Sequence, residues 1–480
     1  MADAKPLLLM PARVVRVPID DPELRAGLAR IRESFDVPAS FPSDVLAAAP
    51  DARGRSRERH DLRDLDLVTI DPPGSRDLDQ AYAAERHGNG FRVHYAIADV
   101  EAFVRDGDVV DQEAHRRGVT VYMPDARAGL YPPAIGEGSA SLLPGVERPA
   151  LCWTFDLDAD GTPTGWHLEP ATVRSRRAWT YAEAQDAIDA GRGPESLALL
   201  RVIGRLRKEA EHARGGFSLS LPSQEVRHRR SGYVLVFDAP RPVETWNAQI
   251  SLLTGLCAAS TMVEAGAGIV RTLPPPDERA LRRLHATADA LDVAWPSEER
   301  YADLLARLDP RDPDHAAFLH QAAETLRGSS YAVLGSGTPP PEHAAIAAPY
   351  AHVTAPLRRL ADRYANAVLL ELFAGRTPPA ELRAALDPLP PIMVDGARRA
   401  HQVERAVVDL AEALVLRGRE GETFPAVVVD VDGARATVVL RRPPIVAGID
   451  ADGALLGDEI AVRLVAVDPT ARRVELTRVS

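Results

Sequence analysis

Apolar and polar positions alternate along the middle of the chain in two different rhythms. Short apolar runs rich in β-branched residues, which are typical of strands, occur at 65–70, 91–100, 119–123, 149–156, 165–173 and 233–237. Apolar residues recur at helical spacing across 181–214, from near 246 onward, and across 356–375 and 395–418. The pattern predicts an α+β domain in which helices wrap a mixed β-sheet or barrel core.

The start of the chain carries a weaker pattern. Residues 12–17 are strand-like, and residues 22–35 repeat leucine and isoleucine at helical spacing. The polar run 51–60, which contains four arginines, is typical of a linker. We therefore predict that residues 1–58 form a short N-terminal segment and linker.

The end of the chain returns to short β-branched runs. Two Asp-Gly pairs, at 432–433 and 452–453, separate these runs in the way that turns separate strands. This rhythm predicts a small five-stranded, OB-like barrel over 421–480, and it leaves 59–420 as one large central domain. Stacking aromatics are scarce in the barrel, where Phe424 is the single candidate, which argues against strong RNA binding by the barrel alone.

Composition narrows the class of protein. A formal net charge of −12 argues against a generally basic nucleic-acid binder, although an arginine-lined channel inside an acidic exterior stays open. No apolar run reaches membrane-spanning length, so we expect no membrane association. Cys152 and Cys257 lie in apolar surroundings without metal-binding spacing, which predicts a reducing, cytoplasmic environment.

The strongest candidate for chemistry is the segment Ile70–Ala81, with the sequence IDPPGSRDLDQA. It places Asp71, Asp77 and Asp79 on a turn that directly follows an apolar strand. Carboxylates that converge repel one another unless a cation lies between them, and hard oxygen ligands suit Mg²⁺ or Mn²⁺. The alternative is a solvated acidic turn with no ligand.

A second candidate is the arginine pair in HVTAPLRRLAD. Thr354 is a possible helix cap and Pro356 suits a first helical turn, which puts Arg358 and Arg359 at the positive end of a helix. A bound anion such as phosphate would resolve that conflict. The alternative is a surface pair that Asp362 compensates.

Two further residues have ordinary and functional interpretations. Glu404 lies at the edge of the apolar stripe of the last long helix, where a glutamate is most often an ion-pair partner. Tyr122 ends a strand before a turn and is either a rim residue or a platform on which a base stacks.

Six sequence motifs follow one another along the chain: IDPPGSRDLDQA, HYAIADV, VTVYMPD, SLLPG with ERPA, HVTAPLRRLAD and HQVERAVVDL. In that order they resemble the catalytic RNB domain of the ribonuclease II/R family, over roughly residues 60 to 420. The C-terminal barrel is similar to a shortened form of the family's terminal RNA-binding barrel. The resemblance implies a Mg²⁺-dependent 3′→5′ exoribonuclease that degrades single-stranded RNA to nucleoside 5′-monophosphates. We expect a monomer without an obligate protein partner.

The resemblance assigns the acidic segment to the metal. Asp71, Asp77 and Asp79 match the family's first three acidic positions, which hold Mg²⁺ and orient the attacking water. Gln80 stands at the fourth position, where the family usually has aspartate; its amide oxygen can still ligate Mg²⁺ but brings no charge. Asp77 and Asp79 are also expected to be catalytic.

The resemblance assigns four residues to the RNA. Arg358 matches the arginine that grips the scissile phosphate, with Arg359 beside it as a further substrate contact. Tyr122 matches the aromatic residue that stacks on the terminal bases and sets the length of the limit product. Glu404 matches a glutamate that helps to seat the 3′ end. Asp99, in the AIADV element, is expected to be structural.

The chain departs from the family in three places. Gln80 replaces an acid, the first 58 residues are too few for paired cold-shock barrels, and the helix around 246–250 lacks a carboxylate where the family commonly carries one. The leading hypothesis is therefore the exoribonuclease. The alternative, favoured by Gln80, is an RNB-fold protein that binds RNA or a partner with little or no hydrolysis.

Overall fold

The computed structural model describes residues 22–217, 223–229, 232–238, 240–309, 312–326, 328–335, 342–440 and 445–479. The strand expected at 12–17 lies outside these residues. Within them, no helix is both long enough and apolar enough to cross a lipid bilayer.

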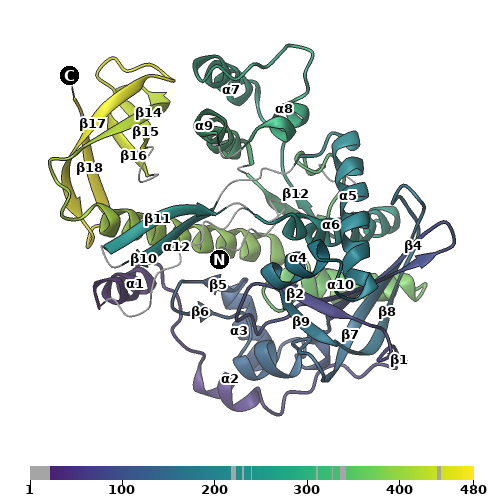
Figure 1. Ribbon diagram of the computed structural model, residues 1–480. Helices are drawn as coiled ribbons and strands as arrows, with labels where there is room; N and C mark the ends of the chain where they lie inside the picture. Colours follow the sequence, from purple (N-terminus) through teal and green to yellow (C-terminus); the bar gives the residue numbers. More distant parts are fainter. Residues whose placement is uncertain are drawn as a thin grey trace.

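A seven-stranded mixed sheet organises the central domain (Figure 1). Its strands are β1 (His60–Asp61), β2 (Val68–Asp71), β3 (Gln80–His87), β4 (Gly90–Ala98), β7 (Glu147–Leu157), β8 (Pro163–Arg174) and β9 (Arg177–Thr180). The order is β1-β8-β7-β4-β3-β2-β9, with the outer pairs β1/β8 and β2/β9 parallel and the inner pairs antiparallel. A tight turn at 88–90 joins β3 and β4 into an antiparallel hairpin.

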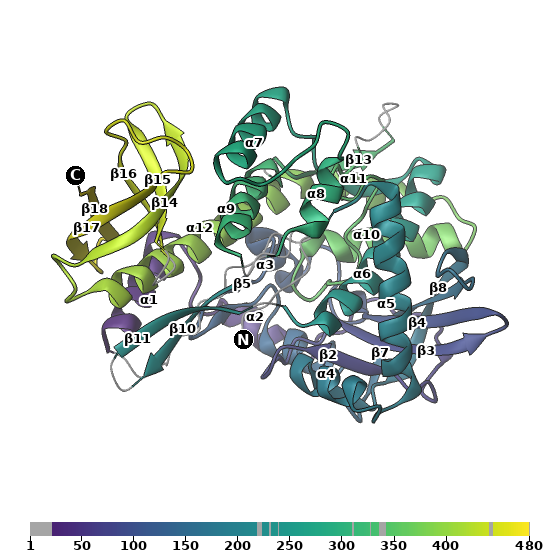
Figure 2. The ribbon, with the colours of Figure 1, turned by 45° about the horizontal axis from the view of Figure 1, so that its top comes forward.

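Helices cover this sheet and bury one large core. They are α3 (Val109–Arg117), α4 (Tyr181–Asp189), α5 (Glu195–Arg214), α6 (Pro242–Ala265), α10 (Leu360–Phe373), α11 (Ala380–Ala384) and the long α12 (Leu389–Leu416). Figure 2 shows α5 and α6 side by side, and α5 also packs on β3 while α10 packs on β8. Trp153 and Phe155 of β7 are fully buried and stacked. The expected mixture of helices and sheet is confirmed.

Short elements connect these layers. They are the two-stranded pairs β5 (Val121–Tyr122) with β6 (Arg127–Ala128), β10 (Ser223–Arg229) with β11 (Gly232–Asp238), and β12 (Gly268–Thr272) with β13 (Ser330–Leu334). Three single turns of helix, at Val100–Ala102, Ala134–Ser139 and Ala323–Leu326, complete the connections. β11 and β5 both pack against α12.

The N-terminal segment packs onto the rest of the chain. Helix α1 (Pro22–Ser34) lies along α12, and the Cα of Gly27 comes so close to Leu410 that a methyl group there would clash with its side chain. Helix α2 (Ser43–Ala48) packs on α3. The predicted linker 51–60 is tied down as well, because the Gly54 N–H donates to the Ala102 carbonyl over 2.9 Å.

The C-terminal barrel sits at the far end of α12, in yellow in Figures 1 and 2. It contains β14 (Thr423–Asp432), β15 (Arg435–Leu440), β16 (Val446–Asp450), β17 (Glu459–Asp468) and β18 (Arg473–Arg478). Their order, β16-β15-β14-β17-β18, confirms the predicted five-stranded module. The pattern of β-branched residues in the sequence did not predict β16.

A cluster of helices joins the barrel to the central domain. It consists of α7 (Glu278–Ala290), α8 (Tyr301–Arg307) and α9 (Pro313–Ala322). Val427 and Val429 of β14 belong to the same buried apolar cluster as these helices. A Cβ added at Gly457 would lie 2.1 Å from the carbonyl oxygen of Ala290, so only glycine fits at this contact.

Candidate active site

The acidic turn lies between β2 and β3, where Pro72, Pro73 and Gly74 (φ +81°) reverse the chain. Leu78 is buried at the centre of the turn, and its N–H donates to Ser141 Oγ over 2.9 Å. Because side chains alternate along an extended segment, anchoring Leu78 in the core turns both neighbouring aspartates to the opposite side.

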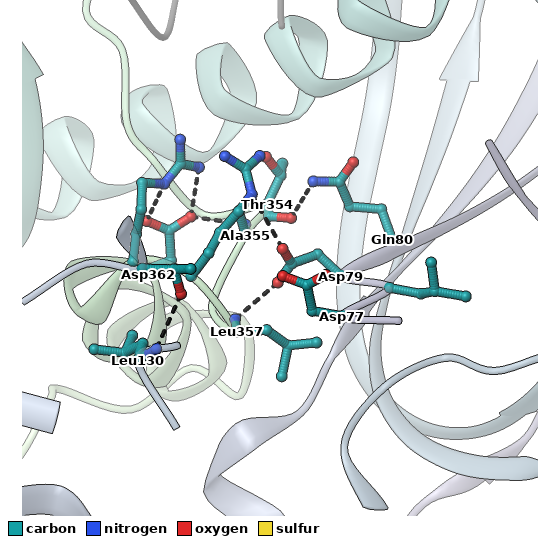
Figure 3. A network of polar contacts seen from close by, with 12 residues as sticks. Asp77, Asp79, Gln80, Leu130, Thr354, Ala355, Leu357 and Asp362 are labelled. Carbon is teal, nitrogen blue, oxygen red and sulfur yellow. Dashed lines mark hydrogen bonds and ion pairs between the residues drawn. The ribbon is translucent and has the colours of Figure 1, made fainter. Parts of the chain in front are cut away.

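Asp79 is the buried acid of the turn. Its Oδ1 accepts from the Leu357 N–H over 2.7 Å, and its Oδ2 accepts from Arg358 Nε over 3.2 Å (Figure 3). Burial raises the pKa of Asp79 to about 7, against the opposing effects of Arg358 and the Leu357 N–H, and the charges of Asp77 and Asp362 raise it further. Desolvation of the Asp79 carboxylate therefore outweighs the two groups that stabilise its charged form.

Asp77 is held by the β5–β6 hairpin. Its Oδ2 accepts from the Tyr122 hydroxyl over 2.9 Å, and its Oδ1 accepts from Arg127 Nη1 over 2.6 Å. Arg127 also contacts Glu137 over 2.6 Å, and it lies opposite Tyr122 in the hairpin register. Tyr122 remains 41% exposed, so an aromatic residue that could stack on a base is hydrogen-bonded directly to a carboxylate of the turn.

The other two residues of the predicted metal set lie at the ends of the neighbouring strands. Asp71 is the last residue of β2 and is half-buried. Burial is the main cause of the raised pKa of Tyr95, and the charge of Asp71 raises that pKa further. Gln80 opens β3; its Nε2 donates to the Thr354 carbonyl, and its Oε1 accepts from the Tyr95 hydroxyl over 2.8 Å. Both ends of the Gln80 amide therefore have protein partners.

The two arginines have different environments. Arg358 is largely buried against Asp79. Arg359 forms a two-point pair with Asp362, with distances of 2.9 Å from Nε to Oδ1 and 2.7 Å from Nη2 to Oδ2. Its Nη1 is buried without a hydrogen-bond partner among the residues that the structure describes. Arg358 thus faces the acidic turn, and Arg359 faces the helix behind it.

The expected helix cap is wrong. Helix α10 begins at Leu360 with Arg359 as its N-cap residue, and Thr354 and Pro356 precede it in a turn. Two N–H groups of this turn bind side chains: the Leu357 N–H donates to Asp79, and the Ala355 N–H donates to Asp362 over 2.8 Å. Tertiary hydrogen bonds thus override the local signal for a helix start.

Three other residues singled out in the sequence are also described. Glu404 is half-buried on α12, and its Oε2 lies 3.9 Å from His401 Nδ1. Asp99 is buried and accepts from Arg59 Nη2 over 2.5 Å and from Arg57 over 3.4 Å, so it ties the 51–60 segment to the central domain. In the helix around 246–250, Gln249 is buried and donates to Glu211 over 2.7 Å.

Sequence reasoning missed Arg127, Glu137 and Tyr95. Arg127 could have been found, because a four-residue turn after Tyr122 brings the chain back opposite it. Tyr95 carries no such signal, since its hydroxyl meets Gln80 and lies 2.8 Å from Ser251 Oγ only after three separate elements have packed.

The donor chemistry of the acidic turn fits a divalent cation. Asp71, Asp77 and Asp79 supply hard oxygen atoms, and a bound cation would favour the ionised form of Asp79, whose pKa burial raises. In the structure as described, no three Asp, Glu, His or Cys side chains are grouped closely enough to hold an ion, and arginines contact Asp77 and Asp79 directly. The fit therefore rests on the donor set and its charge.

Comparison with known proteins places this site in a family. A model described as the RNB domain matches residues 59–375, and one described as the RNase II-type exonuclease C-terminal S1 domain matches residues 422–479. The chain belongs to the RNB family.

Among named relatives, Ribonuclease R of Thermotoga maritima is 26% identical over 454 residues, which cover 88% of this chain and 62% of that protein. The probable exosome complex exonuclease RRP44 of Caenorhabditis elegans is 32% identical over 324 residues, covering 63% and 33%. The chain thus spans less than two thirds of the length of these relatives.

Solved structures share the fold. Mycoplasma genitalium RNase R in complex with ribose-methylated single-stranded RNA superposes with a TM-score of 0.86 at 20% identity, covering 95% of this chain and 78% of that chain. Yeast Ssd1, a pseudonuclease, superposes with a TM-score of 0.72 at 17% identity, covering 95% and 58%. Because both nucleases and a pseudonuclease have this fold, the activity depends on the site residues.

Proposed function

We propose that this chain is a Mg²⁺-dependent 3′→5′ exoribonuclease, with Mn²⁺ as a possible substitute, that hydrolyses single-stranded RNA to nucleoside 5′-monophosphates. The observation that carries the proposal is the buried Asp79–Arg358 pair, which lies next to a second carboxylate, Asp77, and its attached aromatic ring, Tyr122. A binding protein has no need for a buried acid whose charge is incompletely compensated.

In this proposal Asp71, Asp77 and Asp79 hold the metal, with the Gln80 amide oxygen as a weaker fourth donor at most. When bound, the ion supplies Lewis-acid stabilisation and lowers the pKa of a coordinated water. Asp79, which the Leu357 N–H holds in place, orients the water for in-line attack.

The RNA contacts come from three elements. Arg358, held beside Asp79, donates to the oxygens of the scissile phosphate, where charge builds up during attack. Arg359 lies next to Arg358 and adds its buried Nη1 as a further donor to the RNA. Tyr122 stacks on the terminal base, and Glu404 of α12 orients the 3′ end of the strand.

The second candidate function is RNA or partner binding with little or no hydrolysis. Gln80 favours it, because an amide at the fourth acidic position weakens any second metal site. We extend the proposal to a monomer in the cytoplasm; two buried thiols, Cys152 and Cys257, that are not in a disulfide support the cytoplasmic location. The proposed domain boundaries are 1–58, 59–420 and 421–480.

The test is Mg²⁺-dependent release of nucleotides from single-stranded RNA labelled at the 3′ end. Asp79→Asn keeps the shape of the side chain but removes its charge, and it should abolish release while RNA binding stays within about twofold. Asp66→Asn is the matched control, because Asp66 is exposed and contacts Arg176 at 3.4 Å. A wild-type chain that binds RNA but releases nothing contradicts the exoribonuclease and supports the binding protein.

A further inference from the structure

Gln80 lies where two parts of the site meet. It is the first residue of β3, directly after Asp79, and its amide nitrogen points at the Thr354 carbonyl in Figure 3. Its amide oxygen accepts from Tyr95 of β4, whose hydroxyl is also 2.8 Å from Ser251 of α6. One side chain therefore connects β3, β4 and α6 to the segment that carries Arg358.

Adjacent residues of the acidic turn bind the same segment at three points. Gln80 binds the Thr354 carbonyl, and Asp79 binds the Leu357 N–H and Arg358 Nε. The three contacts span five residues of a turn whose own backbone hydrogen bonds run from the N–H groups of Arg358 and Arg359 to the Ala355 carbonyl, over 3.1 and 2.9 Å. The direction in which the Arg358 side chain leaves the backbone thus depends on the Gln80 bond as well as on Asp79.

A carboxylate cannot replace this amide. The Thr354 carbonyl is an acceptor, and an ionised aspartate or glutamate offers only acceptors, so two oxygens would face each other. Thr354 is buried, which makes an unsatisfied or repelled carbonyl there costly. The acid that the family usually carries at this position would therefore break the contact instead of improving the site.

We propose that Gln80 is a positioning residue that holds the 354–358 segment, and through it Arg358, against the acidic turn. This inference rests on the proposed exoribonuclease function for its kinetic consequences. It reverses the expectation drawn from the family pattern, because the amide at the fourth acidic position then supports catalysis through its N–H group and contributes no essential oxygen to the metal.

Two variants separate positioning from metal ligation. Gln80→Met keeps the length of the side chain, is neutral, and supplies neither the N–H donor nor an oxygen that Mg²⁺ accepts. Gln80→Asp introduces the usual family residue. If Gln80 positions Arg358, both variants should lower kcat about tenfold, with KM for RNA and the half-saturating Mg²⁺ of Gln80→Met changed by less than about twofold.

The coupling to Arg358 is tested by a double-mutant cycle under single-turnover conditions. In the Arg358→Ala background, Gln80→Met should have almost no further effect on the chemical step, because the group that it positions is gone. Tyr95→Phe removes the partner of the amide oxygen and should reproduce a smaller loss of kcat. Purely structural damage would instead add to the effect of Arg358→Ala.

Some outcomes would overturn the inference. A higher kcat or a lower Mg²⁺ requirement in Gln80→Asp, or a raised Mg²⁺ requirement in Gln80→Met, assigns Gln80 to the metal instead. Thermal unfolding without metal tests the contact independently of activity. Gln80→Met should lower the midpoint temperature of unfolding, and an unchanged midpoint would reject the proposed contact between Gln80 and the 354–358 segment. If the wild type is inactive, the proposed function fails, but the unfolding measurement still shows whether Gln80 holds the 354–358 segment.

Discussion

Asp77 and Asp79 are two residues apart on the same turn, yet the structure surrounds them very differently. Asp79 is buried and is held by partners nearly 280 positions away in sequence, one of which is the backbone N–H of Leu357. Asp77 is held by two side chains of one nearby hairpin, Tyr122 and Arg127. We call Asp79 with its partners Leu357 and Arg358 the rear wall of the site. Asp77 with its partners Tyr122 and Arg127 is the front wall.

The difference separates what is fixed from what can be exchanged. A backbone N–H cannot leave Asp79 without moving the whole 354–358 segment, whereas Arg127 and Tyr122 can turn away from Asp77 by changing rotamer. The rear wall therefore sets the geometry of the reaction, and the front wall is where a metal or RNA can replace existing partners.

The largest effect should come from breaking the rear wall at Arg358. Arg358→Lys keeps the charge but loses Nε and the planar fork, so kcat/KM should fall about 100-fold or more. Arg376→Lys is the control, because Arg376 is exposed and pairs with Glu371 over 2.7 Å, away from the acidic turn; it should leave kcat/KM within about twofold. Equal kinetic losses in both variants would contradict the role of Arg358.

The next effect concerns the exposed ring of the front wall. Tyr122→Ala should lengthen the limit product left from 5′-labelled RNA, because stacking on the terminal base is lost. Tyr122→Phe keeps the ring but not the bond to Asp77, so the product length should stay the same while the rate falls about threefold. An unchanged product ladder in Tyr122→Ala rejects the stacking role.

A smaller effect, and one that improves metal binding, is expected from removing the positive charge of the front wall. Arg127→Gln removes the cation that compensates Asp77, so the half-saturating Mg²⁺ concentration should fall about threefold. Arg76→Gln is a close control, since Arg76 lies 3.6 Å from Glu137 and is well exposed. A higher Mg²⁺ requirement in Arg127→Gln would show that Arg127 organises the metal site instead of competing for it.

The last prediction concerns stability instead of rate, and it tests the support behind the rear wall. His343 is buried at the start of the segment that leads to Arg358, and burial, with help from Arg271, lowers its pKa to about 4. Between pH 6.5 and about 4 the unfolded chain binds a proton there that the native chain does not. Stability should therefore be complete above pH 6.5 and fall with acidification, by at most about 3 kcal/mol.

His343→Phe should remove that part of the acid sensitivity, measured as the free energy of urea unfolding at pH 7 and pH 5. The control is His87→Phe, which changes an exposed histidine and should leave the pH dependence as it was. A His343→Phe chain that loses stability with acid as steeply as the wild type would reject this account.

The sequence predicted elements better than it predicted their junctions. The strands of the sheet and the barrel follow the β-branched runs, since alternation and Asp-Gly turns are local signals. The front wall was within reach, because Tyr122 and Arg127 are close in sequence. The rear wall was not: the start of α10 was misplaced, and the Gln80 bond to Thr354 joins residues 274 positions apart.

The contact between Gly457 and Ala290 has a consequence for how such proteins can be recombined. The barrel fits against α7 with no room for a side chain, and Val427 and Val429 complete the apolar cluster of the neighbouring helices. A barrel transplanted from a relative would bring a surface shaped for other helices. Functional chimeras should therefore exchange residues 274–326 and 421–480 together, as one inherited unit.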